Sequence, residues 1–86
     1  MSDFYFVEEL IKKELPDAQV FVEDLTGTKD HLAITIVSSV FEGKLLFQQH
    51  QIIMTILKEE LKTRIHAVKL QTYTPSKYLE SKKEKL

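Results

Sequence analysis

Three histidines are the side chains of this 86-residue sequence best suited to chemistry, because the sequence contains no cysteine. The lack of thiols excludes a disulfide, a zinc–thiolate site and a cysteine nucleophile. Any iron or zinc site must therefore use carboxylates or the imidazoles of His31, His50 and His66. No G-x-S-x-G elbow, P-loop, G-x-G-x-x-G loop or H-E-x-x-H pair occurs in the sequence, so we expect a protein that is not an enzyme.

His50 falls within an apolar stripe, unlike the other two histidines. Residues of this stripe recur at intervals of four and three, which is typical of one buried helical face. The stripe consists of Leu46, His50, Ile53, Leu57 and Leu61. A histidine in such a stripe is more often a hydrogen-bonded packing residue than a metal ligand, so we predict a structural role for His50.

The elements that position these residues follow from the spacing of apolar side chains. A spacing near 3.6 predicts helices, and alternation predicts strands. The predicted helices span residues 2–14 and about 45–57, and the predicted strands span about 19–25, 32–38 and 67–73. Turn-forming residues at 26–31 favour an antiparallel hairpin between the first two strands, and Gly43 can adopt a positive φ in a tight connection at 41–44. We expect a break at 62–65 and a short helix or frayed tail at 76–86.

The order αββαβ indicates an α+β fold with a three-stranded mixed sheet covered by helices on one face. A helical crossover joins the second and third strands, which makes them parallel. Parallel neighbours start at the same edge of a sheet, about 5 Å apart. Since His31 precedes one of these strands and His66 the other, their imidazoles should lie within about 5–10 Å of each other. Histidines at strand starts are more often turn or strand-end residues than ligands, so both interpretations stay open.

Size and charge set further bounds. We expect one domain over residues 1–86, with a core at about 4–78 and a charged tail at 79–86. The first residues are acidic rather than basic, and no apolar run approaches the ~18 residues of a membrane span, so we expect a cytoplasmic protein that does not bind membranes. The net charge is −1, yet residues 26–86 hold ten basic and six acidic side chains. This asymmetry is ordinarily a solvated surface, and otherwise a weak phosphate-binding patch.

Several short motifs together resemble the BolA/IbaG family. They are Phe41-Glu42-Gly43-Lys44, Gln48-Gln49-His50-Gln51, Ile65-His66-Ala67-Val68 and Thr72-Tyr73-Thr74-Pro75. The resemblance extends over about residues 7–78, and the combination at these spacings is specific. It implies a fold similar to a type II KH domain. It also implies a partner of monothiol glutaredoxins that shares a 2Fe–2S cluster, in iron–sulfur maturation, iron homeostasis or bacterial transcriptional control.

The resemblance implies that His66 is a cluster ligand, because it matches the family's C-terminal signature histidine. The family's second ligand comes from the loop between the first two strands, as Cys or His. Thr28 or Lys29 stands where several relatives have Cys, so His31 is the nearest substitute. A glutaredoxin cysteine and a glutathione thiolate would supply the other two ligands. The isolated chain would then hold no cluster, and we expect it to be a monomer or a weak homodimer.

A KH-like nucleic-acid-binding transcriptional regulator is the alternative function. KH domains clamp a nucleic-acid backbone with a G-x-x-G loop, and here Gly27 and Gly43 are sixteen positions apart, so that loop is missing. DNA binding would be weak and salt-sensitive because it would depend on lysine contacts to phosphates. The candidate contacts are Lys44, Lys58, Lys62 and Lys69. A metal-free adaptor is a third interpretation.

Overall fold

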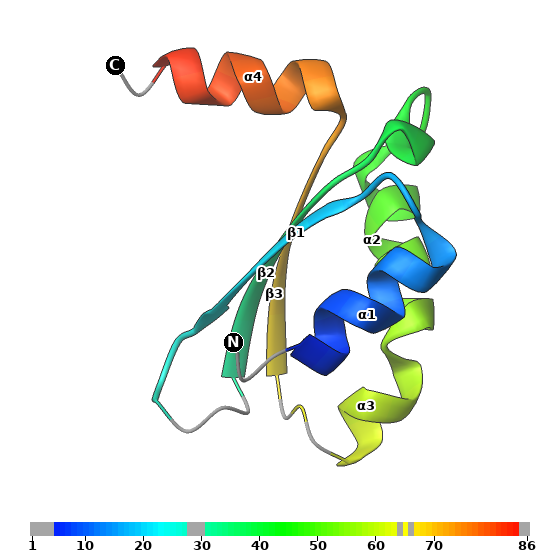
Figure 1. Cartoon of the computed structure of the whole chain (residues 1–86), viewed down its shortest axis with the longest axis vertical. Helices are drawn as coiled ribbons and strands as arrows, with labels where there is room; N and C mark the ends of the chain where they lie inside the picture. The colour runs from blue at the N-terminus through cyan, green and yellow to red at the C-terminus, as the bar shows by residue number, and fades with distance from the viewer. Residues whose placement is uncertain (1–4, 28–30, 64, 66, 85–86) are drawn as a thin grey trace.

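The computed structural model describes residues 5–27, 31–63, 65 and 67–84 (Figure 1). The elements are α1 (Tyr5–Glu14), β1 (Gln19–Asp24), β2 (His31–Val37), the 3₁₀ turn η1 (Ser39–Phe41), α2 (Leu46–Ile56), α3 (Lys58–Thr63), β3 (Ala67–Tyr73) and α4 (Pro75–Glu84). The predicted αββαβ order and the α+β class are confirmed, and the structure has two further helices, α3 and α4. Within the described residues, no helix is both long and apolar enough to cross a bilayer.

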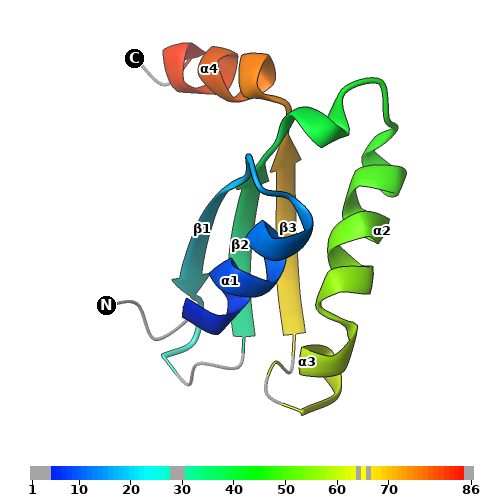
Figure 2. The same ribbon diagram turned by 45° about the vertical axis from the view of Figure 1, so that its right-hand side comes forward.

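The three strands form one mixed sheet in the order β1-β2-β3. β1 and β2 are antiparallel, as their hairpin predicts, and β2 and β3 are parallel, as the crossover through α2 and α3 predicts. The parallel register pairs His31 with Ala67 at the start of both strands and Val37 with Tyr73 at their end. The starting ends of β2 and β3 therefore lie side by side at one edge of the sheet (Figure 2).

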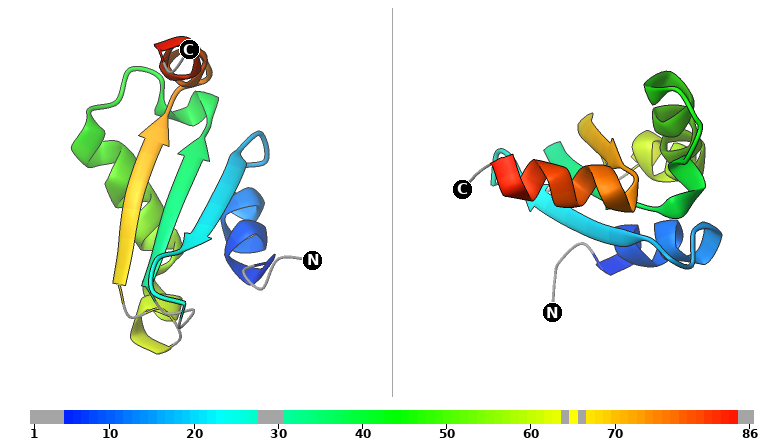
Figure 3. Two further views of the ribbon diagram at one scale, coloured as in Figure 1. Left: turned by 90° about the vertical axis from the view of Figure 1, so that its left-hand side faces the viewer. Right: turned by 90° about the horizontal axis from the view of Figure 1, so that it is seen from above.

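The core lies between this sheet and the helices α1 and α2. Alternate residues of the strands and one stripe of each helix are buried there; they include Val7, Ile11, Val20, Leu32, Ile34, Ile36, Ile53 and Leu57. Figure 3 shows α4 leaving the end of β3 and running away from the side that carries α1 and α2. Tyr78 of α4 stacks on Phe21 of β1, with ring centroids 5.9 Å apart. α4 thus adds a small aromatic contact to the fold, and the predicted tail is helical as far as Glu84.

One prediction about the second helix was wrong. Leu46 was placed on the buried stripe, but it is 61% exposed, because the first turn of α2 lies beyond the core and burial begins at Ile53. The predicted bounds of about 45–57 are confirmed, since α2 spans Leu46–Ile56. The chain bends at Leu57, which has φ −92° and ψ 4°, and α3 follows as far as Thr63, so the first two residues of the predicted break at 62–65 are helical. The bend lets Leu57 and Leu61 both pack on the core, Leu57 fully and Leu61 in part. No glycine or proline marks this bend in the sequence.

Candidate functional site

The predicted histidine site is at the starting ends of β2 and β3. His31 is half-buried and opens β2, directly opposite Ala67 in the parallel register. His66 is the residue before Ala67, and it lies outside the described residues, as do Thr28 and Lys29. The framework of the predicted site, two parallel neighbouring strands that start together, is therefore confirmed. The side-chain geometry of the pair stays a prediction.

Backbone hydrogen bonds fix His31 in place on the side of β1. The Leu25 N–H donates to the His31 carbonyl oxygen at 2.8 Å. The preceding turn begins at Asp24, whose carboxylate Oδ1 accepts from the Gly27 N–H at 2.9 Å and from the Thr26 N–H at 3.3 Å. A carboxylate that accepts backbone N–H groups two and three residues ahead is a common way to start a turn. The Asp24 side chain thus orders the hairpin at the point where the chain leaves β1.

The donor set at this corner is small. Across the described ranges, no group of three or more His, Cys, Asp or Glu side chains could hold a metal ion. The described residues at the corner offer the His31 imidazole, with the Asp24 carboxylate engaged in its turn. A metal centre built here would therefore need ligands from the neighbouring residues of the chain and from a partner molecule.

His50 lies on α2, half-buried. Its Nε2 atom is buried and has no hydrogen-bond partner among the described residues, so the hydrogen bond that we predicted for it is not seen at that atom. The neighbouring Gln49 makes the polar link between α2 and the sheet instead. Its Oε1 accepts from Thr72 Oγ1 of β3 at 2.7 Å, and its Nε2 donates to the Lys44 carbonyl at 3.0 Å.

Sequence reasoning missed the pair of Gln49 and Thr72. Thr72 takes a buried, inward-facing position on β3, which an apolar residue would ordinarily fill. A threonine at an inward position of a strand is the available signal, because a buried hydroxyl needs a partner. The sequence does not say which residue that partner is, since Gln49 is 23 positions away.

A second missed interaction joins the α1–β1 turn to the end of β2. The Asp17 carboxylate accepts from Ser39 Oγ at 2.6 Å, from the Ser39 N–H at 2.9 Å and from Ser38 Oγ at 2.8 Å. These hydrogen bonds, those from Ser39 first, lower the pKa of Asp17 from 3.8 to about 2. Asp17 therefore stabilises the fold as an anion, and it lies at the opposite end of β2 from His31.

Gly43 has φ +74°, which confirms the predicted positive φ. An added Cβ would meet no atom within 4 Å, so backbone conformation and not close packing favours glycine at this position.

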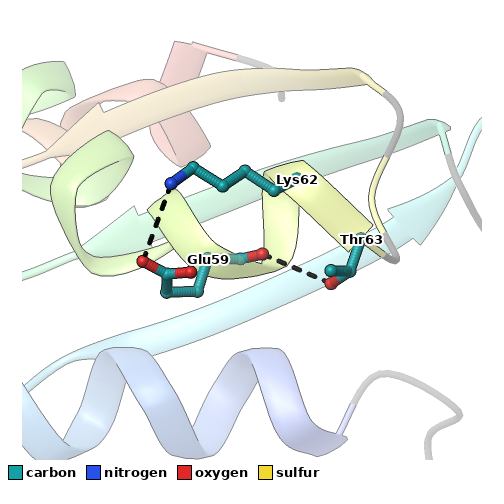
Figure 4. A network of polar contacts seen from close by, with 3 residues as sticks. All are labelled: Glu59, Lys62 and Thr63. Carbon is teal, nitrogen blue, oxygen red and sulfur yellow. Dashed lines mark hydrogen bonds and ion pairs between the residues drawn. The ribbon is translucent and has the colours of Figure 1, made fainter.

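The four candidate lysines do not share one face. Lys44 precedes α2, Lys58 and Lys62 belong to α3 beyond the other end of α2, and Lys69 lies on the side of β3 that faces away from α1 and α2. Since α2 has 11 residues, about 16 Å of helix separates Lys44 from Lys58. Lys62 also forms an exposed ion pair with Glu59 at 3.9 Å, beside the bond from Thr63 Oγ1 to the Glu59 carbonyl (Figure 4). These four lysines thus form no continuous basic stripe.

Comparison with known proteins agrees with the fold and with the motifs. The family model described as BolA-like protein matches residues 7–77. BolA-like protein 2 of Mus musculus is 33% identical over 81 residues, spanning 92% of this chain and 93% of the relative. The DNA-binding transcriptional regulator BolA of Escherichia coli is 40% identical over 48 residues, 56% of this chain and 46% of that protein. The solved structure of BolA1 from Arabidopsis thaliana is similar with a TM-score of 0.79 and 31% identity, over 88% of this chain and 95% of that one. The chain therefore belongs to the BolA-like family.

Proposed function

We propose that this chain is a BolA-like partner of monothiol glutaredoxins that shares a 2Fe–2S cluster with them, in iron–sulfur maturation or iron homeostasis. The observation that carries the proposal is the register of the sheet, which sets His31 opposite the residue that follows His66. His66 belongs to the Ile65-His66-Ala67 motif of the family. Family membership supports this assignment, as does the start of β3 at Ala67, the last residue of the motif.

The donor chemistry of the corner favours a shared cluster over one held by this chain alone. A 2Fe–2S cluster needs four protein or thiol ligands, and this sequence has no thiolate to offer. Two imidazoles, from His66 and His31, would leave two positions for the thiolates of a glutaredoxin and glutathione. When bound, the cluster would supply iron and sulfide for transfer or sensing, with a reduction potential that imidazole ligation raises.

The fold of this chain would position the proposed ligands of the cluster. Pairing of β2 with β3 holds His31 opposite Ala67, the residue that follows His66, and the turn that begins at Asp24 anchors the loop from β1. The half-buried position of His31 leaves part of its surface open to a partner molecule. Neutral imidazole is the form of histidine that binds a metal.

Co-expression with a monothiol glutaredoxin, followed by visible absorbance and iron analysis of the purified complex, tests the proposal. We expect a cluster spectrum in the wild-type complex and its loss in His66→Ala, with a similar or smaller effect of His31→Ala. His50→Ala is the matched control, since it removes the third histidine and should leave the spectrum of the folded fraction intact. A cluster that survives His66→Ala unchanged would refute the assignment.

Nucleic-acid binding is the second candidate function, favoured by the relative named as a DNA-binding transcriptional regulator. Lys44, Lys58, Lys62 and Lys69 would bind phosphates without reading sequence, and their dispersion over the fold predicts weak binding. Titration of duplex DNA at two salt concentrations decides this: tight, sequence-selective binding that persists at high salt would rank this function above the first.

A further inference from the structure

A pocket of about 560 Å³ lies where the loop before α2 meets the first two turns of α4. Both segments lie beyond the end of β3 (Figure 2). Three of the four motifs noted in the sequence contribute to this pocket, because residues 41–44, Gln49 and residues 72–74 all line it. The proposed cluster uses only the fourth motif, at the start of β3, and so gives this pocket no role.

Hydrogen bonds hold the loop side of the pocket in place. Gln49 Nε2 donates to the Lys44 carbonyl at 3.0 Å, and the Lys44 N–H donates to the Phe41 carbonyl at 3.1 Å. The same glutamine accepts from Thr72 Oγ1 at 2.7 Å, which ties the loop to β3. Phe41 and Thr72 are buried, so the base of the pocket belongs to the folded core. This side is therefore formed before any ligand arrives, as is usual for small-molecule sites.

The α4 side of the pocket is anchored as well. Thr74 starts the helix, since its carbonyl accepts the Tyr78 N–H at 3.0 Å and its Oγ1 accepts the Lys77 N–H at 3.3 Å. The Tyr78 ring stacks on Phe21 at 5.9 Å between centroids and lies 5.7 Å from the ring of Tyr73. These contacts hold the first turns of α4 against the sheet and fix where their side chains lie.

The charges that line the pocket are balanced. The loop contributes Glu42 and Lys44, and α4 contributes Lys77 and Glu80. All four side chains are exposed, and none of them forms an ion pair within the described part of the chain. A purely anionic ligand such as phosphate would be attracted by the two lysines and repelled by the two glutamates. A ligand that carries both an ammonium and a carboxylate group can be attracted by both kinds of side chain at once.

We propose that this pocket binds a small zwitterion, a short peptide with a free α-amino group and a free α-carboxylate. The carboxylate should lie at Lys77, because the positive end of the α4 dipole adds to the charge of that lysine. The ammonium group should then lie at Glu42 on the loop. Leu46, which lines the pocket and is 61% exposed, offers an apolar contact to a ligand side chain.

Binding should be weak, since ion pairs to exposed side chains contribute little, and we expect a dissociation constant on the order of 1 mM. The pocket volume of about 560 Å³ is within the range of small-molecule sites, ~300–1,000 Å³. This inference goes beyond the proposed glutaredoxin partnership, because it uses none of the residues at the histidine corner. Failure of either proposal would leave the other intact.

NMR titration of the full chain with the dipeptide L-alanyl-L-leucine tests the pocket. We expect the backbone amide signals of residues 42–44 and 76–78 to shift in a saturable way. The N-acetylated dipeptide lacks the ammonium group and the C-terminal amide lacks the carboxylate, so each should bind about two- to fivefold more weakly. Absence of saturable shifts at these residues would overturn the proposal. Inorganic phosphate that binds the same residues more tightly than the dipeptide would also overturn it, because the pocket would then be a simple anion site.

Charge-neutralising variants assign each end of the ligand. Lys77→Gln should weaken binding of the dipeptide about two- to fivefold and leave binding of its C-terminal amide unchanged. Glu42→Gln should weaken binding of the dipeptide and leave binding of the N-acetylated form unchanged. Lys58→Gln is the matched control, since Lys58 is an exposed lysine of α3 that does not line this pocket. Unshifted signals elsewhere in the spectrum should show that the variants fold. An equal loss in Lys58→Gln, or equal losses for the blocked and free dipeptides, would overturn the proposal.

Discussion

Replacement of Gln49 by alanine should destabilise the protein more than replacement of an exposed residue of α2, such as Gln51. Thr72 is 8% exposed and donates its hydroxyl to Gln49 Oε1 at 2.7 Å. Gln49→Ala leaves that hydroxyl buried without its partner, which costs about 1–3 kcal/mol. It also removes the donor to the Lys44 carbonyl, which fixes the loop before α2. We expect a total of about 2 kcal/mol, or a melting temperature lower by roughly 8–16 °C for a domain of this size.

A double-mutant cycle separates the hydrogen bond from other effects of the substitution. Thr72→Val keeps the shape of the side chain and removes the donor, and Gln49 Oε1 can then turn to water because the glutamine is only part-buried. The single Thr72→Val variant should cost about 0.5–1.5 kcal/mol, and the double variant clearly less than the sum of the two singles. Gln51→Ala, the same change at an exposed position of α2, should stay within about 0.5 kcal/mol of wild type. Additive effects of the two substitutions in chemical denaturation would refute the link between Gln49 and Thr72.

Three further predictions concern stability. His50→Ala should lower the free energy of unfolding by about 1 kcal/mol through lost packing. The free energy of unfolding of His50→Leu should match or exceed that of wild type, because the change removes a buried nitrogen without a partner among the described residues. Equal losses for the two variants in denaturant titrations would mean that the imidazole makes a needed polar contact. Because the folded pKa of Asp17 is lowered from 3.8 to about 2, its stabilising effect is present above pH 3.8 and is lost as the pH falls towards 2. Wild type should therefore melt above Asp17→Asn at neutral pH, by a modest amount since the carboxylate is exposed, and the gap should close in that window; a gap independent of pH would contradict the assignment. Gly43→Ala should cost about 1–2 kcal/mol from the positive φ alone, and an unchanged melting temperature would show that the loop relaxes to another conformation.

The sheet could be predicted from the sequence because its signals are local. Alternation from Ala67 to Tyr73 gave the bounds of β3, and the crossover length gave its parallel pairing with β2. The His31 corner follows from that pairing alone, since parallel neighbours start together. The order of the elements and the direction of the strands could thus be predicted without knowing which side chains are in contact.

Burial along α2 could not be predicted in the same way. The apolar spacing of Leu46, Ile53 and Leu57 is uniform, but only the part of the helix that lies over the core is buried, and Leu46 falls beyond it. The bend at Leu57 has no glycine or proline to mark it, because it arises from packing and not from a local backbone preference. The bonds of Gln49 to Thr72 and of Asp17 to Ser39 join residues more than 20 positions apart, which no local pattern reveals.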